Sequence, residues 1–288
     1  MPYLIHLAIL IGIYAILGLS LNLVVGYTGL LSVAQSAFYG IGAYVTALLL
    51  VNNGWNFFPA MVVGVLASGI IALAIGLVLS KFDGDYYALA SIGLGVIIYS
   101  VFLNWQSLTG GPLGIPGIPR PVLFGFAFSD NLSFLILTFA FVVLVYFASR
   151  FIVNSSFGRV LKTIREDEKA VQVFGYKTLN YKLAIFVIGA MMAAIAGSLY
   201  AAYITYIDPS TFTVNGSIFV IAIIILGGLA SLRGSIIGAV FLVLLPEFLR
   251  FVGFPDEIAA QMRQAVYGLL LILLMLYRPQ GLVGEYKL

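Results

Sequence analysis

The stretch RFIVNSSFGRVLKTIREDEKAVQVFGYKTLNYK, residues 150–182, is the one strongly polar part of an otherwise apolar chain. It holds seven of the fourteen Lys and Arg residues and the acidic run Glu166, Asp167 and Glu168. Ionised side chains and unpaired backbone groups are too costly in hydrocarbon, so this segment must lie in water between membrane-buried parts. Its excess of basic residues predicts a position on the cytoplasmic side.

The rest of the chain has the composition of an integral membrane protein. Hydrophobic residues make up 62% of the 288 residues and charged residues 9%, against about 25% charged in soluble domains. Residues 1–80 contain no Asp, Glu, Lys or Arg. The net charge of +3 reports membrane topology and does not indicate nucleic-acid binding. Because cysteine is absent, disulfides and thiol-bound metals are excluded.

Apolar windows predict an all-α polytopic membrane protein with about nine transmembrane helices, within a range of eight to ten. We expect one transmembrane domain over residues 1–288, with a cytoplasmic loop at 152–182 between the fifth and sixth spans. The first apolar run is long and follows no Lys or Arg, so we expect a retained span rather than a cleaved signal peptide. The expected spans are about 4–25, 29–50, 58–79, 86–103, 133–151, 183–206, 216–230, 235–252 and 264–277.

Strict alternation of these spans places the N-terminus outside and the C-terminus inside. Eleven Lys and Arg residues then lie inside and three outside, as the positive-inside rule requires. The turn Gly26-Tyr27-Thr28-Gly29 has two interpretations, because it carries no charge that would hold it at the membrane surface. It is either a surface loop or a helix break inside the membrane, and the second would leave the N-terminal orientation open.

Two of the expected spans carry small residues at helical spacing, which lets helix backbones approach closely in lipid. These stripes therefore predict a compact bundle. They consist of Ala60, Gly64, Ser68, Ala72 and Gly76 in one span, and Gly189, Ala193 and Gly197, beside Ala190, Ala194 and Ser198, in the other.

Missing motifs exclude several enzyme classes. The chain has no GxxxxGK[ST] P-loop for ATP, no HExxH pair beside its single histidine, His6, and no GxSxG elbow. We therefore predict no catalytic residue, no metal site and no cofactor in this chain. The expected spans also lack acidic residues at mid-membrane, which disfavours a proton- or sodium-coupled transporter and would place the energy source of any transport outside the polypeptide.

Neutral polar residues inside the spans are the candidates for a substrate path. Uncharged side chains and helix ends suit a zwitterionic or uncharged solute, and the alternative is structural hydrogen bonding between helices. Glu247 and Arg250, near the outer end of a span, form either a functional polar pair or a local i, i+3 pair at the interface. The path candidates are Asn22, Ser32, Gln35, Ser36, Ser91, Gly93 and Gly95.

Residues 157–175 have the pattern of an amphipathic helix of about four turns. Ser155 and Ser156 can cap its start, apolar residues recur at helical spacing, and Gly175 fits its end. We expect its apolar side to dock in a groove of another protein. The alternative is a helix lying on lipid headgroups, which the acidic residues 166–168 disfavour because anionic lipid repels them.

Five blocks of the sequence closely resemble the LivM-type permease of bacterial branched-chain amino acid ABC importers, over nearly the whole chain. The resemblance implies a pore subunit that pairs with a LivH-type second permease in the bacterial or archaeal plasma (inner) membrane. It also implies two ATPase subunits, which carry the ATP and Mg²⁺, and a periplasmic or lipoprotein solute-binding protein. The blocks are GYTGLLSVAQSAFYGIGAY (26–44), DYYALASIGLG (85–95), LTGGPLGIPGIP (108–119), FGRVLKTIREDEKAVQVFGY (157–176) and ILGGLASLRGSIIGA (225–239).

In that family the cytoplasmic loop docks on the ATPase with a loose E-A-A-x-x-x-G pattern. Aligned on Gly175, Ala170 matches the pattern, while Lys169 stands at the leading Glu position and Glu168 lies one residue earlier. Urea importers use a similar permease, so urea is an alternative substrate, and a self-sufficient channel or secondary transporter is a second alternative. The ATPase-coupling residues that the resemblance implies are Arg159, Lys162, Ile164, Arg165, Glu166, Asp167, Glu168, Ala170, Val171, Phe174 and Gly175.

Overall fold

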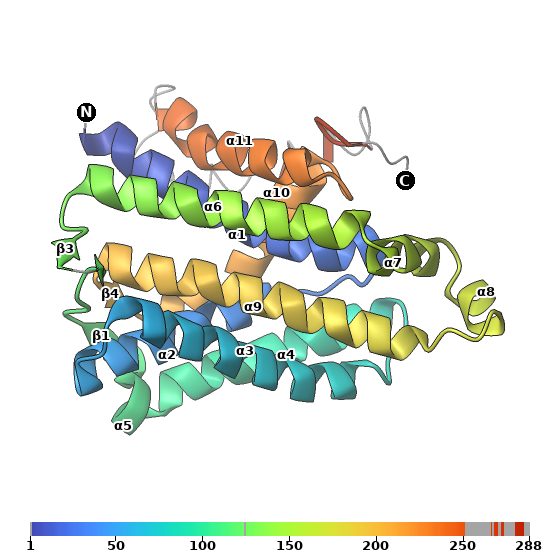
Figure 1. The fold of residues 1–288 in the computed structure, drawn as a ribbon, viewed down its shortest axis with the longest axis horizontal. Coiled ribbons are helices and arrows are strands. Elements are labelled where there is room, and N and C mark those ends of the chain that lie inside the picture. Colours follow the sequence, from blue (N-terminus) through green and yellow to red (C-terminus); the bar gives the residue numbers. More distant parts are fainter. Residues whose placement is uncertain are drawn as a thin grey trace.

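A computed structural model of the chain describes residues 2–123, 125–250, 266, 268–269, 272–273 and 280–284. These residues form an elongated bundle of helices with short strands at one end (Figure 1). The elements are α1 (Pro2–Thr28), α2 (Gln35–Asn53), α3 (Phe57–Leu79), α4 (Asp85–Asn104), α5 (Gln106–Thr109), η1 (Gly111–Leu113), β1 (Ile115–Pro116), β2 (Val122–Leu123), β3 (Phe126–Ala127), α6 (Asn131–Asn154), α7 (Ser156–Glu166), α8 (Glu168–Val173), α9 (Thr178–Ile204), β4 (Tyr206–Ile207), η2 (Pro209–Phe212), α10 (Val214–Gly227) and α11 (Leu232–Arg250).

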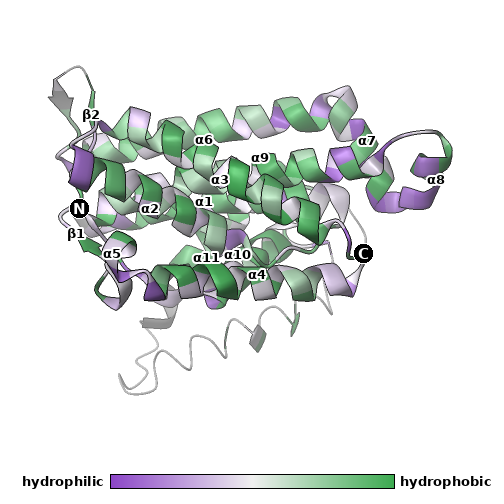
Figure 2. Cartoon of the chain, turned by 90° about the horizontal axis from the view of Figure 1, so that it is seen from below, coloured by the Kyte–Doolittle hydropathy of each residue, from purple (hydrophilic) through white to green (hydrophobic). Residues whose placement is uncertain are grey.

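The protein is a polytopic membrane protein. Among the described residues, five helices (α1, α3, α4, α6 and α9) are long and apolar enough to cross a bilayer. A sixth span results if α10 and α11, which meet at a bend of 119°, are counted as one. Figure 2 shows the apolar character continuing along the bundle, while polar residues gather at its two ends and on α7 and α8.

The structure changes the bounds of several expected spans. The span expected at 29–50 is α2, which begins only at Gln35. The spans expected at 216–230 and 235–252 are α10 and α11, and the 14 residues of α10 reach only about 21 Å at 1.5 Å per residue. That is short of a hydrocarbon core of about 30 Å, so α10 does not cross it as a straight helix. The span expected at 264–277 lies outside the described residues, apart from isolated positions.

Gly29 separates the first two helices. The chain stays helical through Gly26 and Thr28, so the break comes after these residues rather than within a helix. Gly29 has φ +74°, a left-handed conformation that glycine adopts without steric cost. Residues 29–34 are not helical, and 32–34 are buried in the bundle. Irregular backbone is tolerated at such depth where protein surrounds it.

The small-residue stripes bring helix backbones into contact, as predicted. A Cβ atom added to Gly42 of α2 would lie 2.4 Å from Ala194 Cα of α9. The Thr46 and Ser198 hydroxyls join the same two helices at 2.7 Å. The stripe of α3 is buried as well, and its Ser68 hydroxyl donates to the carbonyl of Ala190 in α9 at 3.1 Å. Helix α9 is therefore packed against α1, α2 and α3 at the centre of the bundle (Figure 1).

The end of the bundle opposite α7 is closed by loops. Strand β1 pairs antiparallel with β4, so that Ile115 lies opposite Ile207. The Phe212 ring of η2 is buried and lies 5.7 Å from the ring of Tyr44 and 6.2 Å from that of Phe102. This aromatic cluster joins the loops to α2 and α4 beneath them.

Candidate functional site

The polar segment forms two helices at one end of the bundle (Figure 1). The Ser155 hydroxyl caps α7 by accepting a hydrogen bond from Gly158 N at 3.3 Å. The Asp167 carboxylate caps α8 by accepting one from Ala170 N at 3.1 Å. The continuous helix expected over 157–175 is thus divided at Asp167, which is extended, and α8 ends at Val173. Asp favours this division because its side chain satisfies backbone donors at a helix start.

The apolar side of α7 and α8 faces this chain. Leu161, Ile164 and Val171 are each buried against the bundle. They are therefore not available to another protein, although the sequence pattern predicted that this whole apolar side would dock on one. Val173 and Phe174, at the end of α8, are instead 86% and 81% exposed. These two residues are called the α8 tip below.

Basic side chains connect α7 to the end of α1. Arg165 donates a hydrogen bond to the carbonyl oxygen of Gly26, and the Lys162 ammonium lies 5.6 Å from the centre of the Tyr27 ring. The last carbonyls of a helix have no partner within that helix, so a basic side chain placed there satisfies one of them. A displacement of α7 would consequently act on the point where α1 ends and Gly29 begins the irregular segment.

The other expected coupling residues stabilise the α7–α8 pair or lie on its surface. Glu168 forms an ion pair with Lys182 of α9, with 2.5 Å between Oε2 and Nζ. Arg159 donates to the Ser156 hydroxyl at 2.7 Å. Gly175 has φ +86° and lies just beyond α8. Glu166 is exposed and Ala170 is half-buried.

A second set of polar groups meets inside the bundle, where the irregular segment enters α2. The Gln35 amide donates to the Ser20 hydroxyl of α1 at 2.6 Å, and Ser36 N donates to the Ser217 hydroxyl of α10 at 2.9 Å. Val33 N donates to the Ser91 hydroxyl of α4 at 2.9 Å. This polar centre is neutral, and Ser32 and Gly95 adjoin it as buried neighbours. It thus joins α1, α2, α4 and α10 through side chains that carry no charge.

Two further path candidates lie apart from the polar centre. Asn22 bonds the turn between α10 and α11: it accepts from Ala230 N at 2.9 Å and donates to the Ser231 carbonyl at 3.0 Å and the Ser235 hydroxyl at 2.7 Å. Gly93 lies on an exposed face of α4 with open space around it. Their part in a substrate path stays a prediction.

The polar centre also includes two residues that the sequence analysis missed, Ser20 and Ser217. Ser20 had a signal, because it interrupts an apolar run two residues before Asn22. Ser217 had none, since a serine at the start of a span is ordinary. Of the outer polar pair, Glu247 is half-buried on α11, whereas the side chain of Arg250 lies outside the described residues.

These features define a polytopic α-helical membrane protein with a neutral polar centre between its helices and a polar helix pair at one end. The chain belongs to the family of branched-chain amino acid transport system permease components, which it matches over residues 3–275. It is 36% identical to the high-affinity branched-chain amino acid transport permease LivM of Salmonella typhimurium, over 94% of this chain and 68% of the relative. Escherichia coli LivM is 35% identical over 97% and 69%, and Escherichia coli LivH is 29% identical over 94% and 91%. No solved structure matches the chain significantly.

Proposed function

We propose that this chain is the membrane-spanning permease subunit of an ABC importer for branched-chain amino acids. It forms the translocation path with a second permease of the LivH type, and separate ATPase subunits drive it. A solute-binding protein delivers the amino acid to the outer loops. The substrate class is supported by the names of the relatives, which are branched-chain amino acid permeases.

The observation that carries the proposal is the α8 tip. Val173 and Phe174 project from the bundle on a short helix whose neighbours Lys169 and Lys177 are charged and exposed. Two large apolar side chains exposed to water do not stabilise the folded protein. Their exposure therefore indicates a partner protein that covers them. The ATPase subunit is that partner, and the α8 tip inserts into a groove on its surface.

The contacts of α7 provide the route from the ATPase into the bundle. Motion of the α8 tip moves α7, and Arg165 transfers this motion to the end of α1 at Gly26. The irregular segment 29–34 moves with the end of α1, because it begins there at Gly29. Its Val33 N donates a hydrogen bond to the Ser91 hydroxyl, which connects the movement to α4. ATP-driven closure of the nucleotide-binding subunits thereby shifts the polar centre between outward-open and inward-open states.

We infer nine membrane-embedded segments: α1, α2, α3, α4, α6, α9, the short α10, α11 and residues 264–277. Of the described helices among them, α10 alone is too short to cross the hydrocarbon core as a straight helix and enters it as one arm of the bend with α11. The basic residues of the α7–α8 end favour its position in the cytoplasm. The strands β1 and β4 then face outward, toward the solute-binding protein. The membrane is the plasma (inner) membrane of a bacterium or an archaeon.

A transport assay tests the proposal. The importer with its ATPase subunits is reconstituted in vesicles, and ATP-driven leucine uptake is measured for the native chain and for Val173→Ser combined with Phe174→Ser. Burying one such side chain stabilises an interface by roughly 1.5–3 kcal/mol, so we expect uptake and ATPase co-purification to fall about ten-fold or more. Lys177→Ala, an exposed change nearby, is the control. Uphill uptake by the permease without ATPase subunits would contradict the proposal, as would full uptake by the double variant.

A further inference from the structure

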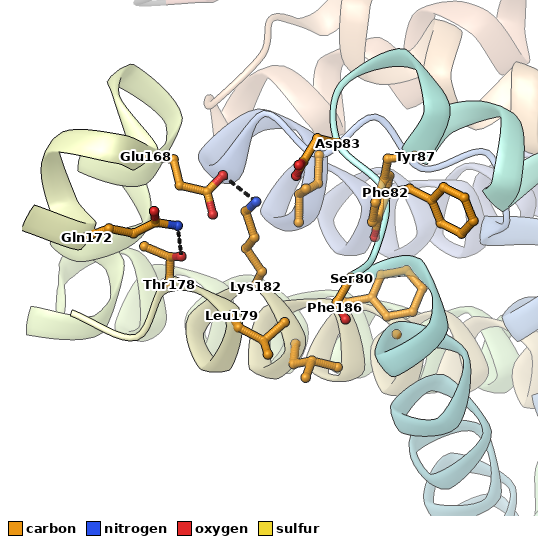
Figure 3. Close-up of a pocket in the computed structure, with 13 residues that line it drawn as sticks. Ser80, Phe82, Asp83, Tyr87, Glu168, Gln172, Thr178, Leu179, Lys182 and Phe186 are labelled. Atoms are coloured by element: carbon orange, nitrogen blue, oxygen red, sulfur yellow. Dashed lines mark hydrogen bonds and ion pairs between the residues drawn. The ribbon is translucent and has the colours of Figure 1, made fainter. Parts of the chain in front are cut away.

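A groove opens at the inner end of the bundle, between α8, the start of α9 and the turn that joins α3 to α4 (Figure 3). Its volume is about 270 Å³. Its buried base includes Tyr87 and Phe186. Gly76 completes the base, and a Cβ atom there would lie 2.7 Å from Leu183 Cδ2 and 3.2 Å from Phe186 Cδ1. The groove therefore has an apolar base, in which Gly76 lets the Leu183 and Phe186 side chains pack closely against α3.

Charges of both signs stand above this base. Lys182 and Glu168 form their ion pair along one wall, with only 18% and 30% of the two side chains exposed. Figure 3 shows the Asp83 carboxylate on the other side of the Lys182 ammonium from Glu168. Lys182 thus pairs with Glu168 in a partly buried wall, where charge pairs are less screened than at an open surface, and the exposed Asp83 lines the groove beyond ion-pair distance of Lys182.

We propose that this groove binds an aliphatic α-amino acid in its zwitterionic form, on the cytoplasmic side of the membrane. The ligand carboxylate pairs with Lys182, its ammonium pairs with Asp83 and Glu168, and its aliphatic side chain packs on Phe186 and Leu179. The choice of amino acid rests on the proposed function, but the pattern of charges and apolar base is independent of it.

The chemistry of the groove selects against other ligands. A zwitterion can pair with charges of both signs in the groove, whereas an amine alone would meet the like charge of Lys182 and a carboxylate alone would meet those of Glu168 and Asp83. A nucleotide or phosphate would be repelled by the carboxylates of Glu168 and Asp83, and only Lys182 would attract it. The volume lies just below the roughly 300–1,000 Å³ of sites for drug-sized ligands, which suits a small metabolite.

The position of the groove gives binding a consequence for transport. Leu30, which lies on the irregular segment leading to the polar centre, also lines the groove. A bound amino acid would connect α8, on which the ATPase acts in the proposed function, to α9 and the α3–α4 turn. The groove opens at the end of the bundle that we place in the cytoplasm, so the cytoplasmic amino acid concentration sets its occupancy.

Binding to the full-length chain in lipid nanodiscs tests this inference, with L-leucine titrated by calorimetry. We expect Lys182→Met and Asp83→Asn to weaken binding about ten-fold or more, because each removes a charge-assisted hydrogen bond. Lys177→Met and Asp85→Asn change exposed residues directly before α9 and at the start of α4 that do not line the groove, and these variants should bind leucine as the native chain does. Isopentylamine and isocaproate, which lack the carboxylate and the amine respectively, should not compete.

A labelling experiment covers the case in which a charge variant fails to fold. The chain has no cysteine, so Phe82→Cys places a single thiol at the edge of the groove, and leucine should slow its reaction with a maleimide. The inference is overturned if Lys182→Met leaves the affinity for leucine unchanged. It is also overturned if leucine does not slow the reaction of the Phe82→Cys thiol with the maleimide. The proposed function then still stands if the complete importer takes up leucine, and it fails separately if ATP-driven leucine uptake is absent.

Discussion

The close contact between α2 and α9 predicts that Gly197→Ala destabilises the folded protein. The added Cβ atom would lie 2.0 Å from the carbonyl oxygen of Tyr39 and 2.9 Å from Ala43 N, both on the backbone of α2. Backbone atoms cannot rotate away as a flexible side chain can. The two helices must therefore move apart, which weakens the neighbouring contact between Thr46 and Ser198 as well.

The expected loss of stability follows from two opposing terms. Overpacking a close-packed interior typically costs about 1–3 kcal/mol, and a backbone clash belongs in the upper half of that range. Alanine lowers the conformational entropy of the unfolded chain relative to glycine, which returns about 0.5–1 kcal/mol. We expect Gly197→Ala to destabilise the folded protein by about 1–2.5 kcal/mol.

Gly93→Ala is the matched control, since Gly93 also lies within a long helix but has nothing within 4 Å of the added atom. It should leave stability unchanged or raise it by up to about 1 kcal/mol. Unfolding midpoints in a denaturing-detergent titration compare both variants with the native chain. Equal midpoints for Gly197→Ala and Gly93→Ala would refute the close approach of α2 and α9.

Three further predictions concern polar contacts. Asn22→Ala should destabilise the protein by about 1–3 kcal/mol, because its partners at the α10–α11 turn lose their hydrogen bonds. Thermal unfolding measures this loss, and Asn104→Ala, at an exposed position, should leave stability unchanged. Equal losses of stability in the two variants would contradict the role of Asn22 in holding the turn. Arg165→Met should reduce leucine uptake several-fold while ATP hydrolysis continues, whereas Lys81→Met, an exposed change outside the α7–α8 pair, should keep both; parallel loss of hydrolysis in Arg165→Met would contradict transfer of motion through Arg165. Ser91→Ala should weaken the hold on the irregular segment and speed its backbone hydrogen exchange, and unchanged exchange would exclude that tether.

The polar centre illustrates what residue patterns could and could not predict. Asn22, Gln35, Ser36 and Ser91 were recognisable as candidates because polar side chains are rare in apolar spans. Their partners were not, since Asn22 bonds the carbonyl of a residue 209 positions further along the chain. A polar side chain in an apolar span can therefore belong to the polar centre, as Gln35 does, or hold a distant turn, as Asn22 does. The sequence pattern is the same in both cases.

Residue chemistry was sufficient for the membrane class and the small-residue stripes, and it predicts that segment 150–182 faces water. Charge is excluded from hydrocarbon and glycine permits close backbone approach, and both effects depend on local composition. The inward orientation of Ile164 and Val171, the bend between α10 and α11, and the groove at Lys182 appeared only in the folded chain. Helices such as α3 and α9 are apolar on all sides, so periodicity cannot distinguish their lipid-facing side from their protein-facing side. Helix packing makes that distinction, because contacts between distant segments decide which polar groups meet.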